Sequence, residues 1–404
     1  MACLICQSST EQFISFGRMP IANGFLTKEQ IPDEFFFELA VAFCPTCTMV
    51  QLVHLVEPQK MFHENYAFFS STSTRMATHF AAFAESVRSK YLTGNDPFVV
   101  EIGSNDGIML QNFAKAGIRH LGVEPSANVA QVAIDKGIRT VCRFFDESFA
   151  KEIVAEHGKA QALLGANVMC HIPTLHSVAA GAAHLLERGG VLVFEDPYMG
   201  DILTKVSYDQ IYDEHAFYFS VSSLSKLFEQ HDMEIIDCAP QDVHGGSMRY
   251  TIAHRGARPV SAAVAAQRAI EDKLGLAHVE SYALLRKKIE RSRDALKGEL
   301  ERLRRDGKRV VGYGATSKST TVTMYCGIGP DLVEFISDTT PIKQGKLSPG
   351  AHIPVRPYQD FTARYPDVAL LFAWNHAQEI KAKETRFREA GGKWLEYVPE
   401  VGLQ

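Results

Sequence analysis

The stretch Phe98-Val-Val-Glu-Ile-Gly103-Ser-Asn-Asp-Gly107 decides the fold, because an apolar run passes directly into a turn that contains glycine. An apolar run of this length predicts a buried strand, and a glycine at its end lets the backbone approach a ligand closely. We therefore expect a strand over Phe98–Ile102, a turn at Gly103 and a helix that opens near Gly107. A strand, turn and helix in this order begin the nucleotide-type α/β domains.

Predicted strands and helices alternate around this turn. A helix is expected over 73–91, where apolar residues recur at helical spacing, and the strands that follow are typical of a parallel sheet. The last two strands are separated only by a short turn at 242–246, so they can pair only as antiparallel neighbours. A parallel sheet that ends in such a pair is typical of class I methyltransferases. The predicted strands are Phe98–Ile102, Leu121–Val123, Ala162–Asn167, Val191–Glu195, Met233–Cys238 and Met248–His254.

The residues near the first turn favour S-adenosylmethionine over a dinucleotide. Glu124 ends the next strand, where its carboxylate can accept hydrogen bonds from ribose hydroxyls. The third glycine of the dinucleotide pattern is replaced by Ile108, and Glu101 and Asp106 would repel a pyrophosphate. NAD(P) remains the alternative. The predicted cofactor-binding residues are Gly103, Asn105, Gly107, Glu124, Asp146 for the adenine amino group, and Asn167 for the methionine end.

Two Cys-x-x-Cys pairs lie in the first fifty residues. Cys3, Cys6, Cys44 and Cys47 supply four thiolates, which match the tetrahedral preference of Zn²⁺ in closed structural sites. A redox pair and unpaired buried thiols are the alternatives. The remaining cysteines fall in apparent core segments and are expected to be small buried hydrophobes; they are Cys142, Cys170, Cys238 and Cys326.

A second glycine turn follows a long helical segment near the C-terminus. Residues 259–306 are helical in character, and a predicted strand over Arg309–Tyr313 enters the turn Gly312-Tyr-Gly314. Further strands are expected at Val333–Ile336 and Val368–Phe372. Lys318 and the amides at the start of the next helix could hold a diphosphate. The alternative is a Rossmann-like domain used only for packing.

Composition and charge narrow the functional class. A formal net charge of −5 over 404 residues argues against a general nucleic-acid binder. No apolar run approaches the ~20 residues that a membrane-spanning helix needs, and no signal peptide is recognisable, so a cytoplasmic protein is expected. The sequence leaves the oligomeric state open and is compatible with a monomer.

Titratable side chains gather beyond the predicted strand Val191–Glu195. The stretch Tyr212-Asp-Glu214-His215 lies past the C-terminal edge of the sheet, where open α/β folds bind ligands. A histidine beside a carboxylate suits general-base chemistry, and His171 is expected to project toward the same edge. Alternatively, these are surface polar residues and a structural histidine.

With these motifs the chain resembles the sugar C-methyltransferases that act on nucleotide-linked 4-keto-6-deoxysugars and make 3-C-methyl branched sugars. The resemblance extends over nearly the whole chain. The matching pieces are the two cysteine pairs, Pro20–Leu26, Tyr66 with Ser70–Ser73, Glu101–Gly107, Asn167–His171, Tyr212-x-Glu-His215, His244–Arg249 and Gly312–Lys318.

The resemblance implies an α/β architecture of three domains and a role for each motif. The expected domains are a zinc-binding module over 1–65, a class I S-adenosylmethionine domain over 66–257, and a helical connector with a Rossmann-like domain over 258–404. His215 would be the base at C3 of the sugar, with Glu214 and Tyr212 beside it. The implied substrate-pocket residues are Tyr66 and His171, and we add His244 and Lys318 as substrate-binding candidates.

The implied reaction removes the C3 proton beside a C4 ketone and methylates the resulting enediolate, with Tyr212 or His171 donating a hydrogen bond to O4. Other functions stay open at this point. They are an NAD(P)-dependent nucleotide-sugar oxidoreductase, a sugar O-methyltransferase, and a zinc-ribbon adaptor without catalysis.

Overall fold

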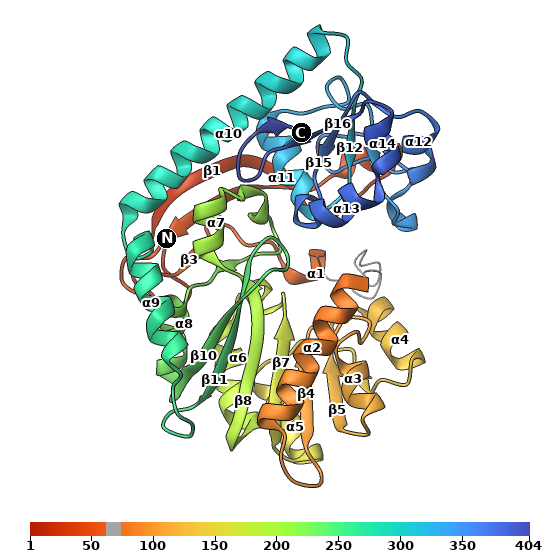
Figure 1. Cartoon of the computed structure of the whole chain (residues 1–404). Helices are drawn as coiled ribbons and strands as arrows, with labels where there is room; N and C mark the ends of the chain where they lie inside the picture. The colour runs from red at the N-terminus through yellow and green to blue at the C-terminus, as the bar shows by residue number, and fades with distance from the viewer. Residues whose placement is uncertain (62–73) are drawn as a thin grey trace.

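The structure of the chain, a computed structural model, describes residues 1–61 and 74–404. Tyr66 and Ser70–Ser73, which the sequence analysis singled out, lie outside the described residues. The described residues form three sheets, one in each region that the sequence separates (Figure 1). Among the described helices, none is both long and apolar enough to cross a membrane.

The central sheet has the strand order β10-β11-β8-β7-β4-β5-β6. Strands β4 to β8 run parallel, β11 pairs antiparallel with β8, and β10 pairs antiparallel with β11. The predicted parallel sheet with a terminal antiparallel pair is therefore confirmed. Its strands are β4 (Phe98–Ile102), β5 (Arg119–Val123), β6 (Thr140–Val141), β7 (Ala160–Ala166), β8 (Leu186–Pro197), β10 (Met233–Gln241) and β11 (Ser247–His254).

Helices follow the strands because apolar residues recur at helical spacing between them. In α2 (Thr74–Tyr91), for example, Phe80, Phe83 and Val87 are buried against the central sheet. The other helices of this region are α3 (Leu110–Lys115), α4 (Ala127–Asp135), α5 (Glu147–His157), α6 (Leu175–Leu185), α7 (Met199–Lys205) and α8 (Val221–Phe228).

The N-terminal sheet includes one strand from the middle of the chain. Its order is β1-β2-β3-β9, from β1 (Glu11–Pro20), β2 (Phe36–Phe43), β3 (Val50–Leu52) and β9 (Phe217–Tyr218). Strand β9 comes directly after the predicted catalytic stretch and pairs antiparallel with β3. The N-terminal module thus fixes the far end of that stretch. Residues between the module and the central sheet include the short helix α1 (Pro58–Met61).

The predicted helical segment is two helices, α9 (Ala262–Leu274) and α10 (Val279–Arg305), and Gly275 at φ +69° ends the first. Helix α10 runs alongside β1 (Figure 1), where the Tyr282 ring lies 5.1 Å from Phe13 and 4.5 Å from Phe43. The helical segment therefore packs against the N-terminal module, and it also joins the central region to the C-terminal region.

The C-terminal sheet has the order β14-β13-β12-β15-β16-β17. Strands β12 to β16 are parallel neighbours, as a Rossmann-like unit requires. The elements are β12 (Val310–Tyr313), α11 (Ser317–Cys326), β13 (Ile336–Ser337), β14 (Val355–Arg356), α12 (Tyr358–Ala363), β15 (Val368–Leu371), α13 (Ala377–Lys383), α14 (Thr385–Glu389), β16 (Lys393–Glu396) and β17 (Gly402–Leu403).

One prediction about the core is wrong. Cys142 is exposed, whereas Cys170, Cys238 and Cys326 are buried as expected. Cys142 follows β6, which is the edge strand of the central sheet, so no neighbouring strand covers it. The domain boundaries predicted at 65/66 and 257/258 stay predictions, and the first lies outside the described residues.

Candidate active site and metal centre

The four N-terminal cysteines meet in one cluster. Their sulfur atoms all lie within 4.8 Å of one another, with 3.5 Å between Cys3 and Cys47 and 3.4 Å between Cys6 and Cys44. The backbone N–H of Ile5 donates to the Cys3 sulfur over 3.4 Å. Four mostly buried sulfurs with amide donors around them fit a closed tetrahedral Zn²⁺ site.

The two cysteine pairs adopt the same turn. The N–H of Gln7 donates to the Cys3 carbonyl over 3.0 Å, and that of Thr48 donates to the Cys44 carbonyl over 2.8 Å. Gln7 and Thr48 each follow the second cysteine of a pair, and both have a left-handed φ, of 62° and 60°. Because a side chain at such a φ is strained, the repeated geometry indicates that the turns are shaped to aim both sulfurs inward.

A cavity of about 410 Å³ opens at the C-terminal edge of β4, β5 and β7. The predicted cofactor residues Gly103, Asn105, Glu124, Asp146 and Asn167 line it, together with His171 and His244. Met76 and Phe80 from α2 form part of its apolar wall.

Unusual backbone conformations concentrate at this cavity. Asn105, Asn167 and His244 have positive φ values of 47°, 52° and 53°. Gly103 has φ +62°, and a Cβ there would lie 2.5 Å from the Val168 side chain. Strain of this kind is typical of ligand-binding loops.

Gly107 lies in the same turn and is not among the residues that line the cavity. It has φ +79°, and a Cβ there would lie 2.2 Å from Cδ1 of Ile138. A glycine at this position therefore lets the turn pack closely against Ile138, and its predicted role in cofactor binding stays a prediction.

The polar groups of the cavity fit S-adenosylmethionine. The Asn167 side-chain oxygen is buried without a hydrogen-bond partner among the described residues, and its charged neighbours in the lining include Glu124 and Asp146. Glu124 accepts the N–H groups of Asn105 and Ser126 over 3.0 and 2.8 Å. Each carboxylate oxygen keeps a second lone pair, so Glu124 can still accept ribose hydroxyls.

The predicted catalytic stretch forms a hydrogen-bonded chain beside the cavity. Nδ1 of His215 lies 2.8 Å from the Gln210 carbonyl, and Nε2 lies 2.9 Å from the Tyr212 hydroxyl. A carbonyl can only accept, so Nδ1 carries the proton. Burial, with His171 next in effect, holds the pKa of His215 well below its usual range. The neutral ring therefore presents its lone pair at Nε2, where Tyr212 donates.

His171 separates this chain from the cavity. Its ring stacks on that of His215 at 5.2 Å and 25°, and it is the one of the four predicted catalytic residues that lines the cavity. Burial lowers the pKa of His171 to about 3. Two neutral imidazoles therefore lie together at the cavity, with His171 in its wall and His215 stacked on His171.

The N-terminal module holds the acidic residues of the catalytic stretch. The N–H of Ala22 donates to Asp213 over 2.9 Å, and the Asn23 amide donates to Glu214 over 2.6 Å. Burial, followed by the neighbouring Glu214, raises the pKa of Asp213. Sequence reasoning gave Asn23 no role, and its only signal was its place in the Pro20–Leu26 motif.

The C-terminal domain holds the same stretch from the other side. Asp209 is fully buried and accepts from Trp374 over 2.6 Å and from Tyr397 over 2.9 Å. The Thr321 hydroxyl donates to the Ile211 carbonyl over 2.7 Å. Sequence reasoning missed these residues because no local pattern relates them to the stretch that they hold.

Lys318 is buried and donates to the His244 carbonyl over 2.7 Å. It does not line the described cavity. The second glycine turn is also filled: Lys343 donates to the Ala315 carbonyl over 2.8 Å, and the Ser317 hydroxyl donates to Asn23 over 3.1 Å. The diphosphate role predicted for that turn stays a prediction, with packing between domains as its alternative.

Comparison with known proteins identifies the family. The chain is 35% identical over 401 residues to a protein named C-methyltransferase NovU from Streptomyces niveus, an alignment that covers 98% of this chain and 95% of that one. The chain belongs to the C-methyltransferase family.

Three family models match successive parts of the chain. They are described as "Putative zinc binding domain" at residues 3–62, "Methyltransferase domain" at 75–237 and "C-methyltransferase C-terminal domain" at 242–399. The predicted S-adenosylmethionine-dependent C-methyltransferase with a zinc-binding module is therefore confirmed.

Two solved methyltransferase structures each match less than half of this C-methyltransferase. Magnesium protoporphyrin IX methyltransferase from Synechocystis PCC 6803, solved with bound SAM, has 13% identity and a TM-score of 0.33, covering 45% of this chain and 78% of that one. The CcbJ methyltransferase from Streptomyces caelestis has 13% identity and a TM-score of 0.35, covering 44% and 90%. The family assignment rests on the sequence matches.

Proposed function

We propose that this C-methyltransferase acts on a nucleotide-linked 4-keto-6-deoxysugar and transfers a methyl group to C3. The observation that supports it most is the chain from Gln210 through His215 to Tyr212, in which a neutral imidazole presents one lone pair beside the cofactor cavity. A base that is uncharged at neutral pH suits removal of a carbon-bound proton beside a ketone. The sugar class comes from the resemblance of the catalytic motifs.

In the proposed reaction the C3–H bond breaks, and Nε2 of His215 gains one proton. The Tyr212 hydroxyl lies on that lone pair, so we infer that it relays the proton, giving its own to Nε2 and receiving the one from C3. The electron pair of the C–H bond moves into the enediolate, with negative charge at O4. A ring N–H of His171, which lines the cavity, is the proposed donor to O4.

Bound S-adenosylmethionine supplies an electrophilic methyl group. Glu124, Asp146 and Asn167 are the residues proposed to hold its ribose, adenine and methionine parts, because all three line the cavity. Tyr66, His244 and Lys318 stay proposed substrate residues: His244 lines the cavity, and Lys318 fixes its carbonyl.

The test is mass spectrometry of the purified enzyme with S-adenosylmethionine and a panel of nucleotide 4-keto-6-deoxysugars in D₂O. We expect one sugar to gain a methyl group, and to exchange the C3 hydrogen for deuterium when the methyl donor is omitted. Methyl gain without C3 exchange would favour an O-methyltransferase. No gain on any sugar, despite donor binding, would overturn the substrate class and leave the family unchanged.

Two variants test the proposed base. His215→Ala should abolish both exchange and methyl transfer, and Tyr212→Phe should lower both by about 100-fold or more if the hydroxyl relays the proton. A suitable control is Tyr358→Phe, which removes a hydroxyl that donates to Glu384 over 2.9 Å within the C-terminal domain. Exchange that survives in His215→Ala would show that another group is the base.

A further inference from the structure

Two neighbouring rows of side chains on helix α2 have different contacts. One row lines the cofactor cavity, and the other binds residues of the central sheet. Met76 and Phe80, four residues apart, line the cavity. Arg75, His79 and Phe83 recur at the same interval and form the adjacent row. The position of one row therefore fixes the position of the other, because a helix is rigid over this length.

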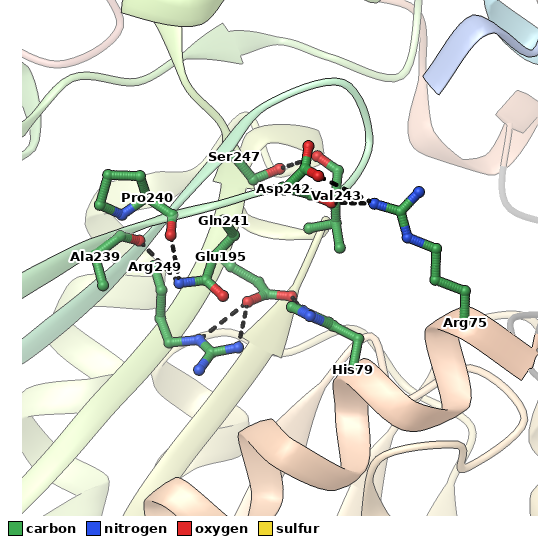
Figure 2. Close-up of polar contacts among 10 residues, drawn as sticks. All are labelled: Arg75, His79, Glu195, Ala239, Pro240, Gln241, Asp242, Val243, Ser247 and Arg249. Atoms are coloured by element: carbon green, nitrogen blue, oxygen red, sulfur yellow. Dashed lines mark hydrogen bonds and ion pairs between the residues drawn. The ribbon is translucent and has the colours of Figure 1, made fainter. Parts of the chain in front are cut away.

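The fastening centres on Glu195, which is buried in β8 with 2% exposure (Figure 2). One carboxylate oxygen lies 2.5 Å from Nε2 of His79. The other accepts from Nε and Nη2 of Arg249, in β11, over 3.0 and 2.8 Å. Burial by itself would raise the pKa of Glu195, but His79 and Arg249 outweigh it and hold that pKa below its usual value. The carboxylate is therefore ionised, and His79 donates to it.

Two further contacts hold the same row. The Arg249 guanidinium carbon lies 3.8 Å from the centre of the Phe83 ring, a cation–π contact to the next turn of α2. Arg75 donates to the carbonyl of Asp242 over 2.6 Å, which ties the start of α2 to the β10–β11 turn (Figure 2). It also donates to the carbonyl of Asn375 in the C-terminal domain over 3.3 Å.

Glu195 also acts on the opposite wall of the cavity. Its backbone carbonyl accepts the N–H of Asn167 over 2.7 Å. Asn167 lines the cavity at a strained φ of 52° and keeps its side-chain oxygen without a partner among the described residues. One residue thus fixes α2 through its side chain and Asn167 through its backbone.

We propose that Glu195, paired with His79 and Arg249, is a positioning residue that sets the affinity for the methyl donor by clamping α2 at the edge of the cavity. The inference rests on the proposed function only in taking the cavity as the donor site. A donor bound between α2 and the strand ends gains from a wall that is already in place, because it need not order the helix on binding. Loss of the clamp should therefore weaken donor binding more than it slows transfer at saturating donor.

The experiment measures binding of S-adenosylhomocysteine by calorimetry, the KM for S-adenosylmethionine, kcat and thermal unfolding. Glu195→Gln keeps the shape of the side chain and removes its charge; His79→Leu removes the donor from α2. We expect each to raise Kd and KM by about tenfold or more, with kcat changed by less than about threefold. His79→Gln, which retains an N–H donor, should recover most of the affinity.

The matched control is Glu85→Gln, which breaks an exposed ion pair with Arg88 on the same helix and should leave Kd unchanged. Lower thermal stability in Glu195→Gln and His79→Leu with unchanged Kd would overturn the proposal, because the clamp would then serve folding alone. Should Glu195→Gln fail to fold, the comparison of His79→Leu with His79→Gln decides. Donor binding by the wild type without methyl transfer to any sugar would refute the proposed substrate class and leave this test intact.

Discussion

The two glycine turns of this chain share a hydrogen-bonding scheme and differ in what lies above them. After β4, Glu124 accepts the N–H of Asn105 in the turn and that of Ser126 at its own strand end. After β12, Asp338 accepts from Ala315 over 2.7 Å and from Thr340 over 2.7 Å in the same way. An acid after the second strand thus braces each turn.

Among the described residues, Gly103 and Asn105 of the first turn line the cavity, and no residue of the second turn does. At the second turn the Lys343 ammonium donates to the Ala315 carbonyl, and the Ser317 hydroxyl donates to Asn23 of the N-terminal module. The same backbone geometry therefore faces a cavity in one domain and side chains of neighbouring segments in the other. The comparison teaches that a glycine turn specifies a local backbone, whereas the neighbouring domains decide whether space for a ligand remains.

Zinc removal should give the largest effect, because it should disturb the catalytic stretch and the second turn while leaving the first turn unchanged. Structural Zn²⁺ in small domains contributes about 10–16 kcal/mol of binding free energy to folding. Without it we expect the Pro20–Leu26 loop to leave Asp213, Glu214 and Ser317, so that kcat falls by about 100-fold or more while the donor Kd stays within about threefold. Metal analysis should find about one Zn per chain, lost in Cys3→Ser with Cys44→Ser. A donor Kd that rises with zinc loss would contradict the separation of the two turns.

Alanine at Gly103 in the first turn and at Gly314 in the second should separate an effect on donor binding from an effect on stability. Gly103→Ala forces a Cβ against Val168 in the cavity wall, and we expect the donor Kd to rise by about tenfold or more from strain of about 1–3 kcal/mol. Gly314 has φ +88°, and a Cβ there would lie 2.8 Å from Cβ of Ala373. Gly314→Ala should therefore lower stability and leave the donor Kd unchanged. Calorimetry and thermal unfolding of both variants test this contrast.

Substitution of the two carboxylates that accept from the turns, Glu124 and Asp338, should give the same contrast in donor Kd with a smaller effect. Glu124→Gln retains one acceptor oxygen and loses the charge, so the donor Kd should rise by about tenfold, the value of a hydrogen bond to a charged group. Asp338→Asn should lower the free energy of unfolding by about the value of one such hydrogen bond, without changing donor affinity. Equal effects of the two variants on Kd would show that the second turn also contacts the donor.

Lys318, which follows the second turn, should make the free energy of unfolding depend on pH. Burial lowers the pKa of Lys318 to about 8, from an ordinary value of 10.5. Between these values the unfolded chain binds the proton that the folded chain has lost, so the unfolding free energy contributed by Lys318 rises with pH across that window. We expect a rise of up to about 3 kcal/mol, absent in Lys318→Met. Denaturant unfolding of both proteins at about pH 7 and about pH 10 measures the difference.

Much of the fold was predictable because its signals are local. The apolar run before Gly103, the spacing of Cys3 and Cys6, and the short turn before β11 each act over a few residues and specify a strand, a metal knuckle and an antiparallel pair. The same reasoning failed at Cys142, because whether a residue near a strand end is covered depends on which strand lies at the edge of the sheet.

The candidate site was predictable in its residues and not in its arrangement. Asn23 contacts Glu214 across 191 positions, and Trp374 contacts Asp209 across 165, so no pattern of neighbouring residues could reveal either pair. His79 and Glu195, which form the clamp, are 116 positions apart, so sequence reasoning could not reveal this pair either.

By itself, the sequence determined the zinc ligands, the first glycine turn, the parallel sheet with its antiparallel edge, and the histidine and tyrosine suited to proton transfer. Only the tertiary structure decided that Nε2 of His215 keeps its lone pair, that the first glycine turn lines the described cavity while the second contacts Lys343 and Asn23, and that Glu195 contacts His79 of α2. The physical reason is that backbone geometry follows local composition, whereas burial, pKa and empty space depend on which distant segments pack together.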